Sequence, residues 1–236
     1  TIDELPPGRK PIKTAHRIDV HRPKVFQFMK EQIAKGRQIY VVYPIIEESK
    51  VLDYENLREG YERITKEFID CKVAMVHGQL NNASRDHNMK EFAEGKINIL
   101  VATTVIEVGV DVPNACVMVI ESSERFGLSQ LHQLRGRVGR GAEESFCILM
   151  TGYKLSAEAR TRMETMVRTT NGFEIAEVDL HLRGPGDMAG TQQSGITDLR
   201  IADLIKDSQI LTFSRTIAEE LLRTDADLAK PENAPI

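Results

Sequence analysis

Hydrophobic residues between positions 23 and 153 follow two alternating patterns. Some recur at helical spacing, as in Val25, Met29 and Ile33, while others form short unbroken apolar runs. The runs expected to be strands are QIYVVYPII (38–46), KVAMVH (72–77), INILVAT (97–103), CVMVIE (116–121) and SFCILMT (145–151). Because strands without polar alternation are buried on both faces, residues 23–153 are predicted to form an α/β domain with a mainly parallel sheet covered by helices.

Local signals mark the helices between these strands. Gly36 is expected to end the first helix, and a second helix is expected around residues 57–68. Ser84 can cap a third helix, which Gly95 is expected to end.

The remaining residues divide into a connector, an appendage and a tail. Residues 1–22 are rich in proline and basic side chains, which predicts an extended connector from a preceding domain. Residues 154–223 predict two helices, a Gly-rich loop and a further helix; FEIAEVDLHLR (173–183) also fits a strand, but its apolar spacing favours a helix. Residues 224–236 are expected to be a frayed tail.

Composition and charge exclude several classes of protein. Of the 236 residues, 41% are hydrophobic and 28% are charged, which excludes collagen-like, disordered and coiled-coil proteins. A net charge of −4 excludes a globally basic nucleic-acid binder but leaves room for a local basic face. No apolar run is long enough for a membrane span. The three scattered cysteines form no disulfide framework, which favours a reducing cytoplasm.

The stretch QLHQLRGRVGRG (130–141) carries two arginines three residues apart. Arg137 and Arg140 are expected on consecutive turns of a helix end, where Gly136 and Gly139 remove side-chain bulk beside them. Each guanidinium presents several fixed donors and stays charged, which suits a crowded anion such as the γ-phosphate of a triphosphate. From the spacing alone, a solvated arginine-rich helix end remains an equal alternative.

The stretch ILVATTVIEVGVDVPNA (99–115) places hydroxyl groups at the carboxyl end of a predicted strand. Open α/β sheets bind ligands at this end, so Thr103 is a candidate for holding a phosphate. Gly109 permits close approach of another backbone, and Asp111 offers a carboxylate to which a ribose hydroxyl could donate. As isolated residues, Thr103 and Asp111 would more often be simple cap and turn residues.

Together these stretches resemble the second motor domain of a superfamily-two helicase. ATTVIEVGVDVP is similar to motif V of that superfamily and QLRGRVGR to motif VI, with VHGQL, Arg85 and FAEGKINILVAT before them in the expected order. RMETMVRTTNGFEIAEVDLHLRGPGDMAGTQQSG (162–195) resembles the translocation motif shared by RecG branch-migration helicases and transcription–repair coupling factors. The sequence RGPGDMAGTQQSG and the opening ELPPGRKPI favour the RecG family, and the resemblance covers nearly the whole chain.

This resemblance implies a fold, a function and residue roles. The fold is a RecA-like helicase C-terminal domain followed by a helical hairpin, a loop and a further helix. The function is that of the C-terminal half of an ATP-dependent DNA helicase that remodels branched DNA, such as stalled forks and Holliday junctions, in recombination and repair. The implied roles are arginine fingers for Arg137 and Arg140, nucleotide binding for Gln133, Gly109 and Asp111, DNA binding for Thr103, His77, Gly78 and Arg85, and coupling to translocation for Arg162, Arg183 and Gln193.

Missing motifs limit what the chain is expected to do alone. It contains no G-x-x-x-x-G-K-[ST] phosphate loop and no Asp-Glu pair after an apolar strand. The chain alone is therefore predicted not to hydrolyse ATP, and ATP and Mg²⁺ are expected to be held mainly by a preceding motor domain of the full-length enzyme. The six histidines lack metal-ligand spacing, so no metal site is expected in the chain itself.

The resemblance also implies partners and a location. Branched or forked DNA, the first motor domain and a wedge domain upstream are the expected partners of a monomeric protein in the bacterial cytoplasm, at the nucleoid. No membrane partner is expected.

Three alternatives remain. A transcription–repair coupling factor carries the same two modules, and an upstream polymerase-binding domain would identify it. A RecA-like module without a motor partner would only hold nucleic acid. GPGDMAG (184–190) loosely imitates a dinucleotide fingerprint, but it follows no clear strand and Pro185 interrupts its turn, which argues against a nicotinamide site.

Overall fold

A six-stranded sheet forms the centre of the molecule. The computed structural model describes residues 11–45, 50–103, 112–139, 141, 144–183 and 208–225. The strands lie in the order β1-β6-β5-β2-β4-β3, and each runs parallel to its neighbours. They are β1 (Lys13–Ile18), β2 (Gln38–Tyr43), β3 (Val73–Val76), β4 (Ile99–Thr103), β5 (Ala115–Ile120) and β6 (Phe146–Thr151). The predicted parallel sheet is confirmed.

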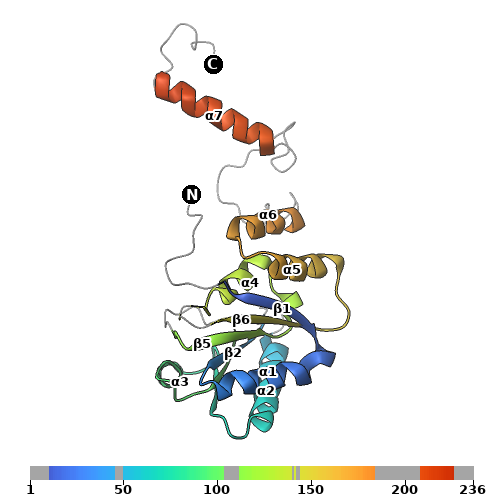
Figure 1. The fold of residues 1–236 in the computed structure, drawn as a ribbon, viewed down its shortest axis with the longest axis vertical. Coiled ribbons are helices and arrows are strands. Elements are labelled where there is room, and N and C mark those ends of the chain that lie inside the picture. The colour runs from blue at the N-terminus through green and yellow to red at the C-terminus, as the bar shows by residue number, and fades with distance from the viewer. Residues whose placement is uncertain are drawn as a thin grey trace. The chain divides into compact units, whose positions relative to one another are not determined.

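Helices from the first part of the chain cover both faces of this sheet (Figure 1). They are α1 (Arg22–Ala34), α2 (Lys50–Glu67), α3 (Asn82–Ala93), α4 (Leu128–Arg135), α5 (Ala157–Arg168) and α6 (Gly172–Arg183), with short 3-10 turns η1 (Asp19–His21) and η3 (Ser123–Arg125). A further helix, α7 (Ser208–Thr224), follows in the chain. The segment at 173–183 is a helix, as its spacing favoured.

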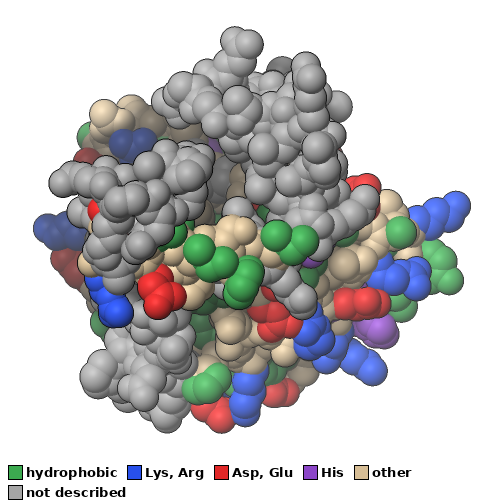
Figure 2. All heavy atoms as spheres, turned by 90° about the horizontal axis from the view of Figure 1, so that it is seen from above, with side chains coloured by type: hydrophobic (Ala, Val, Ile, Leu, Met, Phe, Trp, Pro, Cys, Tyr) green, Lys and Arg blue, Asp and Glu red, His purple; other side chains and the backbone are tan. Residues whose placement is uncertain are grey.

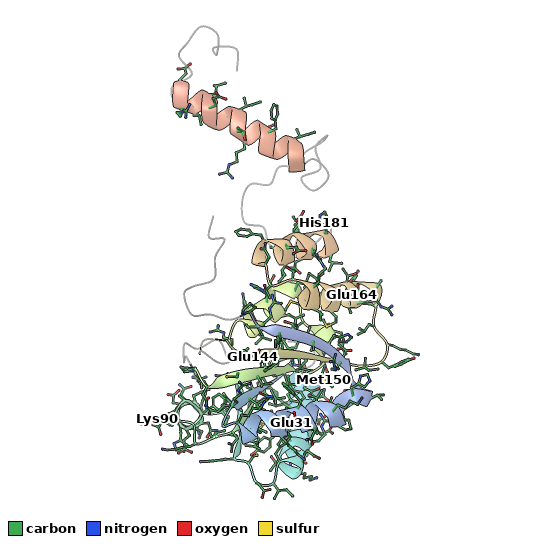
Figure 3. All side chains as sticks on the ribbon, viewed as in Figure 1. Glu31, Lys90, Glu144, Met150, Glu164 and His181 are labelled. Carbon is green, nitrogen blue, oxygen red and sulfur yellow. The ribbon has the colours of Figure 1, made fainter. Side chains whose placement is uncertain are left out.

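The core has two layers because the inner strands are apolar on both sides. Every residue of β2, β4 and β5 is buried. One layer joins α1 and α2 to the sheet through residues such as Met29 and Ile64. The other joins α3, α4, α5 and α6 to the opposite face through residues such as Leu131 and Met166. Figure 3 shows Met150 within the sheet, whereas the exposed Lys90 on α3 lies at the periphery.

The first strand differs from the sequence expectation. The connector predicted for residues 1–22 contains an edge strand, since Lys13–Ile18 pair in parallel with β6. An edge strand has one neighbour and tolerates polar and charged side chains, so its sequence carries no apolar run. Its pairing partner lies far along the chain, which leaves no local signal for the strand.

The start of α3 also differs. The N-cap is Asn81, whose side chain accepts a hydrogen bond from the backbone N–H of Ser84 at 2.8 Å. Asn and Ser are both favoured N-cap residues, so the sequence alone does not show which of them begins the helix. The point at which the loop after β3 turns into the helix makes Asn81 the cap. Gly95, with φ +76°, follows the helix as expected.

Two compact units divide the chain, Thr1–Leu182 and Arg183–Ile236. The first holds the sheet and the helices through Leu182 of α6. The described part of the second unit is α7, which exposes the side chains of Ile210, Phe213 and Ile217. The Gly-rich loop before α7 lies outside the described residues. Among the helices described, none has the length and apolar character needed to cross a membrane.

The coloured part of the surface view carries mixed charge. Acidic and basic side chains are interspersed over the face shown in Figure 2, and no continuous basic area appears among them. This agrees with the small net charge of −4.

Candidate nucleotide and nucleic-acid sites

Among the described residues, those singled out for nucleotide or nucleic-acid contact divide between the two edges of the sheet. Thr103 is the last residue of β4, and His77 and Gly78 directly follow β3. These three therefore lie at the carboxyl edge, where the parallel strands end. Arg137 follows α4, whose chain runs back from the carboxyl edge to the start of β6. It lies at the amino edge.

Thr103 is fully buried at the carboxyl edge. Its Oγ1 has no hydrogen-bond partner in the described part of the chain, and its neighbour in the sheet is Tyr43 of β2. A buried hydroxyl without a partner costs about 1–3 kcal/mol relative to a satisfied one. Within the described residues, Thr103 therefore keeps an unused donor at this edge.

His77 is a neutral group at this edge. Its ring meets Tyr54 edge-on, with centroids 5.4 Å apart, and its Nδ1 accepts a hydrogen bond from the backbone N–H of Gln79 at 3.3 Å. Burial lowers the pKa of His77, so the imidazole is uncharged at neutral pH. With Nδ1 accepting, Nε2 carries the proton and can donate one hydrogen bond to an anion.

Arg85 lies in the first turn of α3. Its Nη2 donates to Asn82 Oδ1 at 2.9 Å, and the residue is half-buried. The same turn presents the backbone N–H groups that begin a helix, which favour anions. Arg85 and the helix start together give this corner groups that can attract an anion.

Arg137 is placed by a turn rather than by a helix. Helix α4 ends at Arg135, so the expectation that Arg137 sits on a helical turn is wrong. The buried Val138 anchors the turn in the core, and Gly139 follows with φ +79°. A left-handed residue at this point reverses the chain and prevents the helix from continuing.

The Arg137 side chain is half-buried, and its guanidinium makes no hydrogen bond or ion pair within the described residues. Gln133, one helical turn earlier on α4, is exposed. Arg140 lies outside the described residues.

Two glycines bring the arginine segment against the start of the strands. A Cβ on Gly139 would lie 3.0 Å from Ile12, which precedes β1, and a Cβ on Gly141 would lie 2.5 Å from the carbonyl oxygen of Pro113, which precedes β5. Gly109 and Asp111 lie outside the described residues, but they come just before the buried Val112 in the chain. The two glycines thus let the arginine segment pack against the starts of the strands, and the Arg137 guanidinium, which has no partner among the described residues, suits a nucleotide phosphate.

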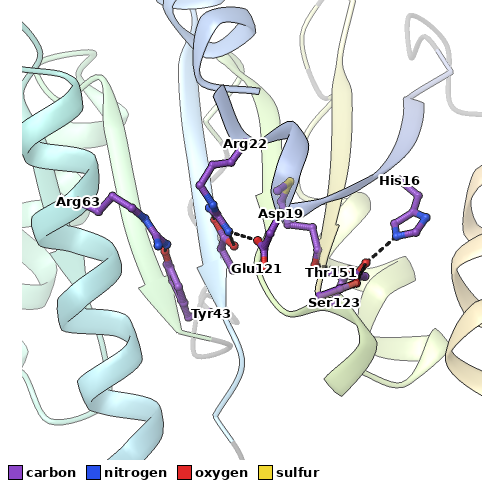
Figure 4. A network of polar contacts seen from close by, with 10 residues as sticks. His16, Asp19, Arg22, Tyr43, Arg63, Glu121, Ser123 and Thr151 are labelled. Atoms are coloured by element: carbon purple, nitrogen blue, oxygen red, sulfur yellow. Dashed lines mark hydrogen bonds and ion pairs between the residues drawn. The ribbon is translucent and has the colours of Figure 1, made fainter. Parts of the chain in front are cut away.

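A polar network that the sequence analysis missed lies at the carboxyl edge (Figure 4). Arg22 donates two hydrogen bonds to Glu121, at 2.5 and 2.8 Å, and one to Asp19 at 2.6 Å. Burial alone would lower the pKa of Arg22, but its bonds and attraction to Glu121 and Asp19 outweigh this and raise it. Arg63 donates to the Tyr43 hydroxyl at 3.3 Å.

These residues line a pocket of about 210 Å³ whose charged walls are Asp19, Arg22, Glu59, Arg63, Glu121 and Arg125. Burial, reinforced by Glu121, raises the pKa of Tyr43 to about 12, so the phenol stays protonated. The one local signal for this site was Glu121, a charged residue directly after an apolar strand. Its partner Arg22 could not be found from local sequence.

The coupling residues are described only in part. Arg162 on α5 donates from Nη2 to the backbone carbonyl of Glu124 at 2.9 Å, while its buried Nε has no hydrogen-bond partner in the described chain. Arg183 ends α6, and its side chain, like Gln193, lies outside the described residues.

Two family models match the chain. Residues 24–142 match the helicase conserved C-terminal domain, and residues 169–236 match the C-terminal part of domain 3 of the ATP-dependent DNA helicase RecG. A curated relative from Synechocystis sp., an ATP-dependent DNA helicase RecG, is 48% identical over 228 residues, which cover 96% of this chain and 27% of the relative. The chain therefore spans about a quarter of that relative's length.

Comparison with solved structures supports the same family and fold. A structure of RecG bound to a three-way DNA junction matches 89% of this chain and 27% of its own, with a TM-score of 0.68 and 45% identity. The second domain of the Mss116p DEAD-box helicase, bound to an RNA duplex, matches 67% of this chain and 61% of its own with a TM-score of 0.52, and at 18% identity it supports the fold alone. The sheet and helices are thus those of a RecA-like helicase C-terminal domain, as predicted. By its sheet, its arginine segment and both family models, this chain belongs to the family of helicase conserved C-terminal domains and, within it, to the RecG branch.

Proposed function

We propose that this chain is the C-terminal motor part of an ATP-dependent DNA helicase that remodels branched DNA, such as stalled forks and Holliday junctions, in recombination and repair. The observation that carries this proposal is the division of the site. Within the described residues, Arg137 at the amino edge of the sheet has no partner, Thr103 at the carboxyl edge has an unsatisfied hydroxyl, and the start of α3 lies at that same carboxyl edge. One domain can thereby touch nucleotide with one edge and nucleic acid with the other.

The amino edge is proposed to receive ATP, together with Mg²⁺, from a preceding motor domain of the same chain. ATP supplies the γ-phosphoryl group whose transfer to water drives the motor. Arg137 and Arg140 would place their donors on the developing negative charge, a contribution worth roughly 10³–10⁵ in rate in comparable enzymes. Gln133, Gly109 and Asp111 would line the nucleotide.

The carboxyl edge is proposed to hold the DNA backbone. Thr103 would donate its hydroxyl to a phosphate, and the neutral His77 would donate from Nε2. Gly78 leaves room for the backbone, and Arg85 supplies the positive charge. We place the parent protein in the bacterial cytoplasm at the nucleoid, as a monomer whose wedge domain engages forked DNA.

Coupling is proposed to run through the appendage. Arg162, Arg183 and Gln193 would link the helical hairpin to the loop that follows it, so that closure of the nucleotide cleft moves the loop. The division into a connector (1–22), a motor domain (23–153), a translocation segment (154–223) and a tail (224–236) belongs to this proposal. The edge strand at Lys13–Ile18 assigns the end of that connector to the sheet.

The test uses the full-length parent protein and forked DNA. Arg137→Ala should reduce fork-stimulated ATP hydrolysis by about a thousandfold or more while fork binding is retained. Arg58→Ala is the matched control, because Arg58 is an exposed arginine of α2 whose guanidinium pairs with Glu62 of the same helix. The 236-residue chain alone should show no Mg-dependent ATPase activity. Wild-type rates in Arg137→Ala, or ATPase activity in the isolated chain, would refute the proposal.

A further inference from the structure

Arg135, the last residue of α4, is a buried cation. Its side chain is 2% exposed, and no other arginine or lysine among the described residues is classed as buried. Its Nη1 donates to the backbone carbonyls of Met166 at 2.9 Å and Thr169 at 2.8 Å. Its Nη2 lies 3.0 Å from His132 Nδ1, which must accept because a guanidinium only donates.

The surroundings of this cation offer dipoles rather than a counter-charge. Within the described residues no carboxylate pairs with Arg135, and burial lowers its pKa. The two carbonyls belong to the C-terminal end of α5, where the last carbonyl groups of a helix lack internal partners and carry partial negative charge. Arg135 therefore caps α5 from a neighbouring helix.

A contribution to folding stability alone does not explain why a buried guanidinium stands at position 135. Replacing buried ionic groups with apolar ones of similar volume is often neutral or stabilising, whereas fixed hydrogen bonds specify geometry. Much of the remaining contact between α4 and the α5–α6 hairpin is apolar, with Leu131, Met163 and Met166 in one cluster. Apolar contact is non-directional and leaves two helices free to shift along one another.

Arg135 stands between two segments that the proposed function requires to move together. On one side, the backbone N–H groups of Arg137 and Val138 bond the carbonyls of Leu134 and Arg135, at 3.0 and 3.4 Å. On the other side, Thr169 lies two residues before Asn171, which caps α6 by accepting from the N–H of Phe173 at 2.9 Å. One side chain thus joins the turn of Arg137 to the turn of the hairpin.

We propose that Arg135 is a positioning residue that transmits displacement of the Arg137 turn to the α5–α6 hairpin. This rests on the proposed function, in which Arg137 engages the nucleotide and closure of the nucleotide cleft moves the loop after the hairpin. Arg135 touches neither nucleotide nor DNA, and it acts through the two turns that it fixes relative to each other.

A second polar link between the same helices provides the comparison. Ser129 Oγ donates to Asp179 Oδ2 at 2.9 Å, which joins the first turn of α4 to α6. This link lies at the opposite end of α4 from Arg137. If adhesion of the hairpin were all that mattered, the loss of either link would have similar effects.

The experiment measures ATP turnover and fork unwinding by the full-length parent protein. Arg135→Met keeps the volume and removes the donors. We expect fork-stimulated ATPase activity within about threefold of wild type, and a fall of about tenfold in forks unwound per ATP hydrolysed. Ser129→Ala should keep that ratio. Arg135→Lys, which retains the charge without the fork of donors, should fall between the two and serves if Arg135→Met does not fold.

The outcomes separate the two proposals. An active wild type with an unchanged ratio in Arg135→Met or Arg135→Lys, or an equal fall in Ser129→Ala, overturns the role of Arg135 and leaves the proposed function standing. A wild-type protein without fork-stimulated ATPase activity overturns the proposed function and the role of Arg135 with it.

Discussion

Gly60 on α2 is required by the side chain that faces it. Tyr43, the last residue of β2, is 5% exposed and lies between α2 and the sheet. A methyl group built on Gly60 would come within 3.0 Å of the Oη, Cζ and Cε1 atoms of Tyr43. Gly60→Ala therefore forces either the ring or the helix to move.

The expected cost follows from two opposing contributions. Alanine in a helix interior is favoured over glycine by about 1 kcal/mol. To relieve the contact, the ring or α2 must shift by roughly 1 Å in a close-packed layer, and such overpacking costs about 1–3 kcal/mol. The close approach involves three atoms of a buried ring, so the upper part of that range applies. We expect a net loss of about 1–2 kcal/mol and a fall in Tm of roughly 2–8 °C.

Denaturant unfolding of the 236-residue chain measures this loss, and a double-mutant cycle assigns it. In a Tyr43→Leu background the phenol ring is absent, so Gly60→Ala should become stabilising by the helix propensity alone. If Gly60→Ala raised the unfolding midpoint in the wild-type background, the packing argument would be refuted.

Two further predictions concern the carboxyl edge and the first strand. Arg22→Met leaves the 6%-exposed Glu121 carboxylate without its partner, so the free energy of unfolding should fall by about 3 kcal/mol. The control Lys13→Met breaks an exposed pair with Glu144 and should lower the free energy of unfolding by less than about 1 kcal/mol. Equal losses in the two variants would contradict the burial argument. Burial, and to a smaller extent the charge of Arg17, lower the pKa of His16 from 6.5, while the charge of Glu124 opposes this shift. The unfolded chain therefore binds more protons than the folded chain, and the free energy of unfolding should decrease as pH falls below about 6.5. His16→Gln should flatten the dependence of the urea midpoint between pH 7.5 and 5, with a remaining slope from His77, whose pKa burial also lowers; an unchanged slope would contradict this assignment.

Local sequence was sufficient to predict those helices and strands in which a single hydrophobic pattern runs along the whole element. The five apolar runs all became strands, because a strand buried on both faces needs continuous apolar residues and no neighbour of a particular identity. The helical spacing of Val25 and Met29 likewise gave α1 and the face that it buries. The motifs around Thr103 and Arg137 identified the family without any structure.

Local sequence failed where the partner was distant. β1 is polar and is a strand because β6 offers it an edge. The Arg22–Glu121 pair joins residues 99 positions apart, and the role of Arg135 depends on carbonyl groups 31 and 34 positions away. Carbonyl oxygens belong to every residue, so no residue type in the sequence could have marked them as partners.

The amino-acid sequence by itself determined the parallel sheet, the order of the motifs and the membership of a helicase family. Those properties depend on periodicity and on residue types at fixed short spacings. The tertiary structure alone decided that the candidate residues divide between opposite edges of the sheet, that Arg137 lies in a turn with its guanidinium free of bonds within the described chain, and that Arg135 ties this turn to the hairpin. Which groups meet depends on how strands and helices that are far apart in the chain pack together, and that packing is set by the whole core rather than by any one segment.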